Sequence, residues 1–276
     1  MILSRRSLLL FLSVLSLYRP GWAQPRTSAS IPRRFAMDAS EAVQGTGHIL
    51  TSPFRWHGKD WLIFGSVVAG TLALSSADER VKDFLDRHHS RSAKNLSEFG
   101  AEYGEPRTVA LLTGSMYVAG LLADNTWLRE TSVILTASLL PAGGIQTLTK
   151  HVAGRARPHV GLGHAKFDSF RNEESYYSFF SGHTMVAMAT SHTLARRIHH
   201  PVAKVVLYGA GAVGGGSRLY NEDHWLSDVV LGSALAIFTV NSVSKWVEER
   251  KQSNELHGLQ WRLLPYEHGV SLSCAW

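Results

Sequence analysis

The sequence predicts an all-α protein whose core is a bundle of about six helices. Long uncharged runs recur along the chain and are separated by charged stretches, the pattern of helices that pack side by side. Apolar residues make up 45% of the 276 positions, enough for one domain with a full core. From Leu259 onward, alternating apolar residues indicate a short extended tail, and we expect no sheet.

The first segment, residues 1–23, is typical of a bacterial export signal. Arg5 and Arg6 precede an apolar stretch over Ser7–Tyr18, and small residues around Ala23 suit cleavage. The arginine pair fits a twin-arginine leader, and an ordinary basic leader stays equally open. An uncleaved anchor is a further alternative, although the apolar stretch is too short to span a membrane unaided.

The helical domain occupies residues 60–250. Before it, residues 24–59 form a polar segment broken by proline and glycine, and after it residues 251–276 form a C-terminal tail. A shorter amphipathic helix is expected near Val81–Phe99. The six uncharged runs that predict the core helices are Trp61–Ala77, Thr108–Ala123, Thr131–Thr149, Thr184–Ala195, Val205–Ser217 and Val229–Ser244.

Three short segments carry the polar groups that a phosphate site needs. They are Lys150 with Arg157 and Pro158, then Ser181-Gly182-His183, then Ser217-Arg218 with His224 and Asp228. Together they supply three fixed cations, two histidines and one carboxylate. A phosphoryl group in transfer spreads negative charge over its oxygens, so positioned cations and backbone N–H groups stabilise it. This set of residues predicts cleavage of a phosphate ester without a metal or other cofactor.

Cations and backbone donors divide the work of binding. Lys150, Arg157 and Arg218 would hold the phosphate, and the two arginines are planar forks that match its oxygens. Ser181 and Gly182 stand just before a predicted helix, so we expect their N–H groups at a helix N-terminus, where anions are favoured.

The two histidines of the motifs take different roles. His224 and Asp228 are four residues apart, which places them on one face of a helix. A carboxylate bonded to one ring nitrogen would fix the tautomer and leave the other nitrogen free to attack phosphorus. His183 would then protonate the leaving alcohol and later activate a water molecule.

These three motifs resemble those of the type-2 phosphatidic acid phosphatase and vanadium haloperoxidase superfamily. The first and third match in full, whereas the middle motif, normally Pro-Ser-Gly-His, begins with Phe180 in this chain. Any one motif is a weak signal, but three in order with fixed spacing are strong. The resemblance implies that Lys150, Arg157, Ser181, Gly182 and Arg218 bind phosphate, that His183 is the acid, and that His224 with Asp228 forms the nucleophile pair.

The resemblance also implies the fold of the type-2 phosphatidic acid phosphatases and a function. We expect a phosphomonoesterase that acts on a phosphorylated lipid, such as phosphatidate, an isoprenoid phosphate or a lipid A phosphate, through phosphorylated His224. A soluble periplasmic acid phosphatase of broad specificity is one alternative. A haloperoxidase that binds vanadate at His224 is another, and a non-enzymatic membrane protein that retains the motifs is a third.

We expect the bundle to be embedded in a membrane, because the stretch from Arg196 to Asp228 resembles the lipid-phosphatase branch of the superfamily. A span needs about 20 apolar residues, and Thr131–Thr149 comes nearest to that length. Arg196, Arg197 and Lys204 suggest a cytoplasmic hairpin, which would place the motifs on the outer face of the inner membrane, towards the periplasm. Six spans after a cleaved leader contradict that orientation, unless Trp61–Ala77 lies on the surface or the whole chain is soluble in the periplasm.

Other features narrow the classes of function. The net charge of +6 fits an anionic substrate or lipid surface and gives no specific indication of nucleic acid. The single cysteine, Cys274, excludes an internal disulfide framework. Gly209, Gly211 and Gly214 have the spacing of a dinucleotide-binding loop, but they lie in an apolar run without a strand before it, which favours close helix packing instead.

Overall fold

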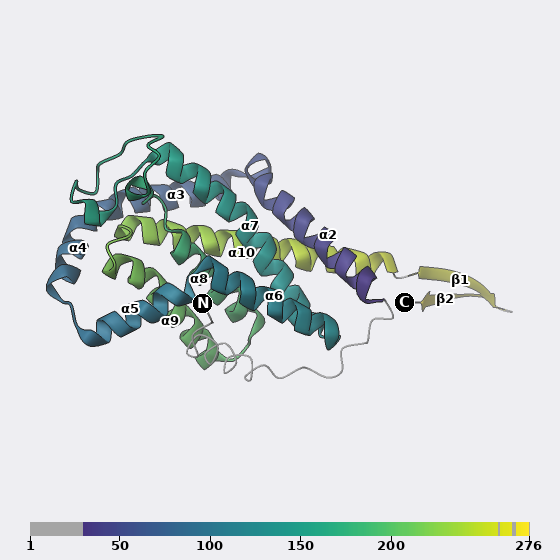
Figure 1. Ribbon diagram of the computed structural model, residues 1–276. Helices are drawn as coiled ribbons and strands as arrows, with labels where there is room; N and C mark the ends of the chain where they lie inside the picture. Colours follow the sequence, from purple (N-terminus) through teal and green to yellow (C-terminus); the bar gives the residue numbers. More distant parts are fainter. Residues whose placement is uncertain (1–29, 259, 267–268, 276) are drawn as a thin grey trace.

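The computed structural model shows a long helical bundle with a β-hairpin after its last helix (Figure 1). It describes residues 30–258, 260–266 and 269–275. The export signal predicted for residues 1–23 lies outside the described residues. The elements are α2 (Ile31–Leu50), α3 (Gly58–Ser75), α4 (Asp78–Arg87), α5 (Arg91–Tyr103), α6 (Pro106–Leu122), α7 (Thr126–Ala153), α8 (Gly182–Arg197), α9 (Pro201–Tyr220), α10 (Leu226–Gly258), β1 (Gln260–Tyr266) and β2 (Gly269–Ala275), with short 3-10 turns at Ser52–Arg55, Pro158–Val160 and Glu174–Tyr176.

The predicted all-α fold is confirmed. Five of the six uncharged runs coincide with a helix to within about five residues at each end, and the sixth, Val229–Ser244, lies inside α10, which continues to Gly258. The amphipathic helix expected near Val81–Phe99 is divided into α4 and α5, because a new helix begins after Ser90. The Ser90 hydroxyl accepts a hydrogen bond from the N–H of Ala93 at 3.1 Å and so caps α5.

Helix α2 was not expected, since it lies in the segment that we predicted to be polar and broken. Pro32 stands in its first turn, where a proline costs no helical hydrogen bond. Ile49 joins a buried cluster with residues of α7 and α10. Gly45 allows the close approach, because a Cβ atom there would lie 3.1 Å from that of Ala137 on α7. Packing against the bundle therefore holds a helix whose sequence contains a proline and two glycines.

The C-terminal tail also differs from the prediction. We expected an extended tail without a sheet, and the structure shows strands β1 and β2 paired antiparallel. The pairing runs from Gln260 opposite Ala275 to Tyr266 opposite Gly269. The alternation of apolar residues in the sequence indicated extended backbone, but it did not indicate which segment each strand would pair with.

The centre of the bundle lies between α7, α8 and α10. Its largest cluster joins Leu135 of α7, Val186 and Ala189 of α8, and Ala236 and Val240 of α10. Several of these residues are small, so the helices approach closely. Packing at this centre fixes the positions of the three helices in space. The motif residues on these helices lie at their ends.

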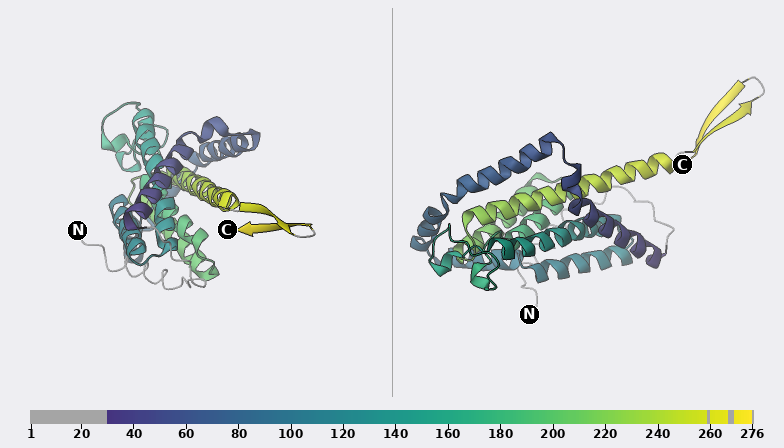
Figure 2. Two further views of the ribbon diagram at one scale, coloured as in Figure 1. Left: turned by 90° about the vertical axis from the view of Figure 1, so that its right-hand side faces the viewer. Right: turned by 90° about the horizontal axis from the view of Figure 1, so that it is seen from above.

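Two helices, α7 and α10, are long and apolar enough to cross a membrane. Helices α3 and α4 together form a third candidate, bent by 52° at the break between them. Helix α3 contacts the bundle mainly through α10 and leaves its other faces uncovered (Figure 2). Leu62 and Leu72 on α3 are 71% and 68% exposed, which indicates an apolar environment around this helix.

Candidate active site

The three motifs meet at the end of the bundle opposite the β-hairpin (Figure 1). Lys150 lies in the last turn of α7, and His183 lies in the first turn of α8. Arg218 lies in the last turn of α9, and Asp228 lies in the first turn of α10. His224 is in the short connection between α9 and α10. Antiparallel packing of these helices thus brings together residues that are far apart in sequence.

Gly154 ends α7 and directs the chain into the loop that carries Arg157. It adopts a left-handed conformation, with φ of 57°. A Cβ atom at this position would lie only 1.8 Å from the carbonyl oxygen of Asp168. Glycine is therefore required here on two grounds, conformation and close approach.

Two of the predicted cations share one carboxylate. Arg218 donates from Nη1 to Oδ2 of Asp223 at 3.0 Å, and Arg157 donates from Nη1 to Oδ1 at 3.4 Å. Within the described part of the chain, Nε of Arg157 is buried without a hydrogen-bond partner. Asp223 thus holds both guanidinium groups together, and Arg157 keeps a donor for a ligand.

The His224 ring is buried and has a defined tautomer. Its Nδ1 lies 2.6 Å from the carbonyl oxygen of Ser178, and a carbonyl can only accept, so Nδ1 carries the hydrogen. In the neutral ring Nε2 then holds a free lone pair. Burial lowers the pKa of His224 well below its ordinary value, and the charges of Lys150 and Arg157 lower it further. Close cations and a neutral imidazole are the arrangement that the nucleophile role requires.

Asp228 does not bond the His224 ring, contrary to our expectation. Its Oδ1 accepts from Nη1 of Arg155 at 2.6 Å, and its Oδ2 accepts from the hydroxyl of Ser178 at 2.6 Å and from the N–H of Trp225 at 3.1 Å. Among the residues that the structure describes, no hydrogen bond joins His224 to Asp228. Ser178 connects the two instead, through its hydroxyl on one side and its carbonyl on the other.

Arg155 extends this buried network to α4. It donates from Nη2 to Oδ2 of Asp78 at 2.7 Å, while Nη1 bonds Asp228. The side chains of Arg155, Asp78 and Asp228 are 3%, 0% and 0% exposed. One arginine between two carboxylates thus fixes the starts of α4 and α10 relative to the loop after α7.

His183 pairs with a carboxylate that the motifs did not indicate. Its Nε2 lies 3.0 Å from Oε2 of Glu105, the residue that precedes α6. Burial lowers the pKa of His183 below its ordinary value and the charge of Arg218 acts in the same direction, whereas the Glu105 carboxylate raises it. A histidine whose side chain is 32% exposed and that is bonded to a carboxylate suits proton transfer.

Ser181 and Gly182 have roles that differ in part from the prediction. The N–H of Ser181 donates to the carbonyl of Asp228 at 3.2 Å, and its hydroxyl caps α8 by accepting from Thr184. The N–H of Ser181 is therefore engaged within the protein. A Cβ atom on Gly182 would lie 2.6 Å from Nε2 of Gln146, so glycine allows α8 to begin against α7. The N–H groups of Gly182 and His183 remain as donors in the first turn of α8.

Several residues with a part in this network were absent from the prediction, Asp78 among them. Arg155 and Asp223 each stand within two positions of a motif residue, so their sequence position was a usable signal. Ser178 lies three positions before Ser181, but only the fold shows what it contacts. Glu105 is 78 positions from His183 and gave no signal at all.

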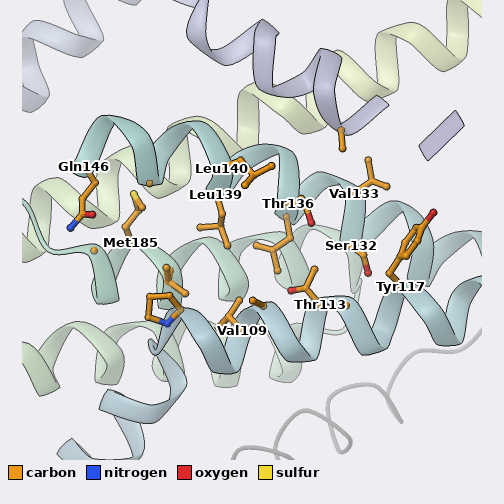
Figure 3. A pocket seen from close by; sticks show the side chains of 18 of the residues that line it. Val109, Thr113, Tyr117, Ser132, Val133, Thr136, Leu139, Leu140, Gln146 and Met185 are labelled. Carbon is orange, nitrogen blue, oxygen red and sulfur yellow. The ribbon is translucent and has the colours of Figure 1, made fainter. Parts of the chain in front are cut away.

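An elongated cavity of about 800 Å³ opens beside this cluster (Figure 3). Lys150, Gly182 and His183 are among the residues that line it. Helices α2, α6 and α7 form most of its walls, and their lining side chains are mainly apolar. Across the described ranges, no group of three or more His, Cys, Asp or Glu residues is arranged to hold a metal ion. Lys150 and His183 therefore belong both to the charged cluster and to the wall of the apolar cavity, so the two adjoin.

Comparison with known proteins confirms the predicted superfamily. Residues 131–252 match the PAP2 superfamily. The fold is similar to that of a transmembrane PAP2-type phosphatidylglycerolphosphate phosphatase from Bacillus subtilis, with a TM-score of 0.50 and 18% identity over 67% of this chain and 95% of that chain. LpxE of Aquifex aeolicus is also similar, with a TM-score of 0.49 and 18% identity over 60% of this chain and 93% of that chain. No curated protein matches the sequence.

Proposed function

Because residues 131–252 match the PAP2 superfamily, we propose that this protein hydrolyses a lipid phosphate monoester through a phosphohistidine at His224. One observation carries the proposal: a cluster of cations around a neutral buried imidazole adjoins an apolar cavity, and Lys150 and His183 belong to both. The cations can bind a negatively charged phosphate group, and the apolar cavity can bind a hydrocarbon chain. A phosphorylated lipid is the substrate class that combines the two.

In the first step the phosphate lies between Lys150, Arg157, Arg218 and the N–H groups that begin α8. Nε2 of His224 attacks phosphorus and the bond from phosphorus to the ester oxygen breaks. His183 gives its proton to the leaving alcohol. The hydrogen bond from Nδ1 of His224 to the Ser178 carbonyl strengthens as positive charge develops on the ring.

In the second step a water molecule attacks the phosphorylated His224. His183, which has lost its proton, accepts one from that water, and the bond from nitrogen to phosphorus breaks. Inorganic phosphate leaves, and both histidines return to their starting protonation states. Each histidine thus completes a cycle without a metal ion.

We also place the protein in the bacterial inner membrane with this site towards the periplasm. Helices α7 and α10 suit a span, and apolar side chains are exposed on several helices. Arg196 and Arg197 end α8, and Lys204 lies in the first turn of α9, so these charges lie at the end of the bundle away from the motifs. The positive-inside rule then supports a cytoplasmic position for that end.

Phosphate release from a panel of lipid and water-soluble monoesters, with a chelator present, tests the proposed function. We expect the detergent-solubilised protein to release phosphate from the lipid esters and His224→Ala to release none. Release that requires a divalent metal would contradict the mechanism, and equal release from small soluble esters would favour a soluble acid phosphatase. Halide oxidation with added vanadate, without phosphate release, would favour a haloperoxidase.

A further inference from the structure

We propose that the cavity between α2, α6 and α7 binds a hydrocarbon chain of the substrate along its length and limits how long that chain can be. This inference rests on the proposed function and adds a site for the lipid tail. It assigns specificity to α2 and α6, which lie outside the part of the chain that matches the superfamily.

The length of the cavity is set by α7, which lines it from Lys150 to Ser132. These residues are 18 positions apart, which corresponds to about 27 Å along a helix. The hydrocarbon core of a bilayer is about 30 Å thick, so one leaflet supplies only about half of that length. The cavity can therefore hold a chain longer than one leaflet, extended beside the helix.

The walls of the cavity are apolar and are kept apart by small residues. Ala39 lies on α2, Ala110 and Gly114 lie on α6, and Gly143 lies on α7. A Cβ atom added at Gly114 or at Gly143 would meet nothing within 4 Å. These positions thus leave open space where larger side chains would close the channel.

A polar cluster closes the far end. Asp38 accepts from Nε and Nη2 of Arg129, both at 2.9 Å, and from the hydroxyl of Tyr117 at 2.9 Å. Figure 3 shows Tyr117 and Gln146 at opposite ends of the cavity. Both oxygens of Asp38 accept hydrogen bonds from Arg129 or Tyr117, so this end is polar and unfavourable for methylene groups. The chain is expected to stop before Tyr117.

Charge distribution identifies the occupant as hydrocarbon. Among the described lining residues, Lys150 and Asp38 are the ones with a charged side chain near neutral pH, and they lie at the two ends. A peptide or a sugar would leave its polar groups without partners along the apolar middle. Phe35 and Leu140 on the rim are 55% and 62% exposed, so a chain can enter sideways from surrounding lipid.

Gly143→Leu tests this site, because Gly143 lies about 10 Å along α7 from Lys150. The side chain of leucine would fill the channel at that depth. For hexadecyl phosphate we expect kcat/KM to fall at least ~10-fold. Hexyl phosphate, whose chain is too short to reach Gly143, should be hydrolysed as by the unmodified protein, which also shows that the variant is folded.

Gly144→Leu is the matched control, since Gly144 is the next residue on α7, is exposed and does not line the cavity. It should leave both esters unchanged. An equal effect of Gly143→Leu on the two esters, or none on either, would overturn the tail site while leaving the proposed function intact. A cavity filled by a protein partner would likewise show no dependence on chain length. If the unmodified protein hydrolysed neither ester, the proposed function itself would fail.

Discussion

The carbonyl oxygen of Ser178 accepts a hydrogen bond from Nδ1 of His224 at 2.6 Å, and the hydroxyl of the same serine donates to Asp228 at 2.6 Å. The carboxylate therefore acts on the histidine through the serine. Its influence is positional, because it holds Ser178 and the loop before α8 in place. This arrangement separates the effects of changes at Ser178, Asp228 and His224.

Ser178→Ala removes the hydroxyl and keeps the backbone carbonyl that bonds His224. We expect the free energy of unfolding to fall by about 1.5–3 kcal/mol, because a hydrogen bond to a buried charge is lost. kcat should fall while KM changes little, since the phosphate ligands are untouched. Ser138→Ala is the control, because the Ser138 hydroxyl is also buried but bonds the carbonyl of Ile134 within α7. A Ser178→Ala protein with unchanged thermal stability would argue against the role of the serine.

Asp228→Asn leaves Arg155 with one carboxylate partner, Asp78. Breaking a buried ion pair in this way should lower the free energy of unfolding by about 3–5 kcal/mol. His224→Gln, by contrast, should change stability less, because it removes no charge partner. Thermal unfolding in detergent measures both. If Asp228→Asn were inactive yet as stable as the unmodified protein, the carboxylate would act on His224 directly.

Covalent trapping checks the role of His224. We expect the protein to become labelled when it is mixed with phosphate-labelled substrate and quenched, with a label that is stable in alkali and released in acid. His224→Gln should show neither label nor turnover, with kcat reduced by about 10⁴-fold or more. His199→Gln, a change at an exposed histidine, is the control and should behave like the unmodified protein. Label retained in His224→Gln would assign the nucleophile to another residue.

The pH profile follows from the two histidines. In the proposed mechanism His224 reacts unprotonated, and its pKa lies well below 6.5, so activity should be lost on the acid side only when the pH falls through that low value. His183 acts protonated and its pKa also lies below 6.5, so activity declines as the pH rises through it. We therefore expect kcat/KM to be maximal below pH 6.5 and to fall towards neutral pH.

Glu105→Gln should move the alkaline side of that profile to lower pH, because the Glu105 carboxylate raises the pKa of His183. The acid side, which belongs to His224, should stay where it is. Glu98→Gln on the exposed face of α5 should leave the whole profile unchanged. An alkaline side that did not move in Glu105→Gln would show that another group donates the proton.

Asp223 competes with phosphate for two arginines. Asp223→Asn removes the negative charge that Arg157 and Arg218 share, so anions should bind more tightly. We expect the inhibition constant for inorganic phosphate to fall several-fold, measured in the hydrolysis of a fixed lipid ester. Weaker inhibition by phosphate would mean that Asp223 mainly orients the arginines.

The positions of the core helices could be predicted because each of them contains a long uncharged run, and such a run can be recognised from a short stretch of sequence. The motif residues were likewise found from type and spacing, since a phosphate site requires cations and imidazoles. Helix α2 was missed because Pro32, Gly45 and Gly47 predicted breaks in that segment, whereas the packing of Gly45 and Ile49 against other helices decides its place.

The sequence alone determined that the protein is helical. It also determined which residues belong to the phosphate site, namely cations, two histidines and a carboxylate. Only the tertiary structure decided that His224 bonds the Ser178 carbonyl and that Arg155 holds Asp228, because a hydrogen-bond partner depends on the path of the loop between α7 and α8. The channel beside α7 was decided in the same way, since it is the space left when α2 and α6 pack against a third helix. Spacing along one chain cannot specify a volume that three separate segments enclose.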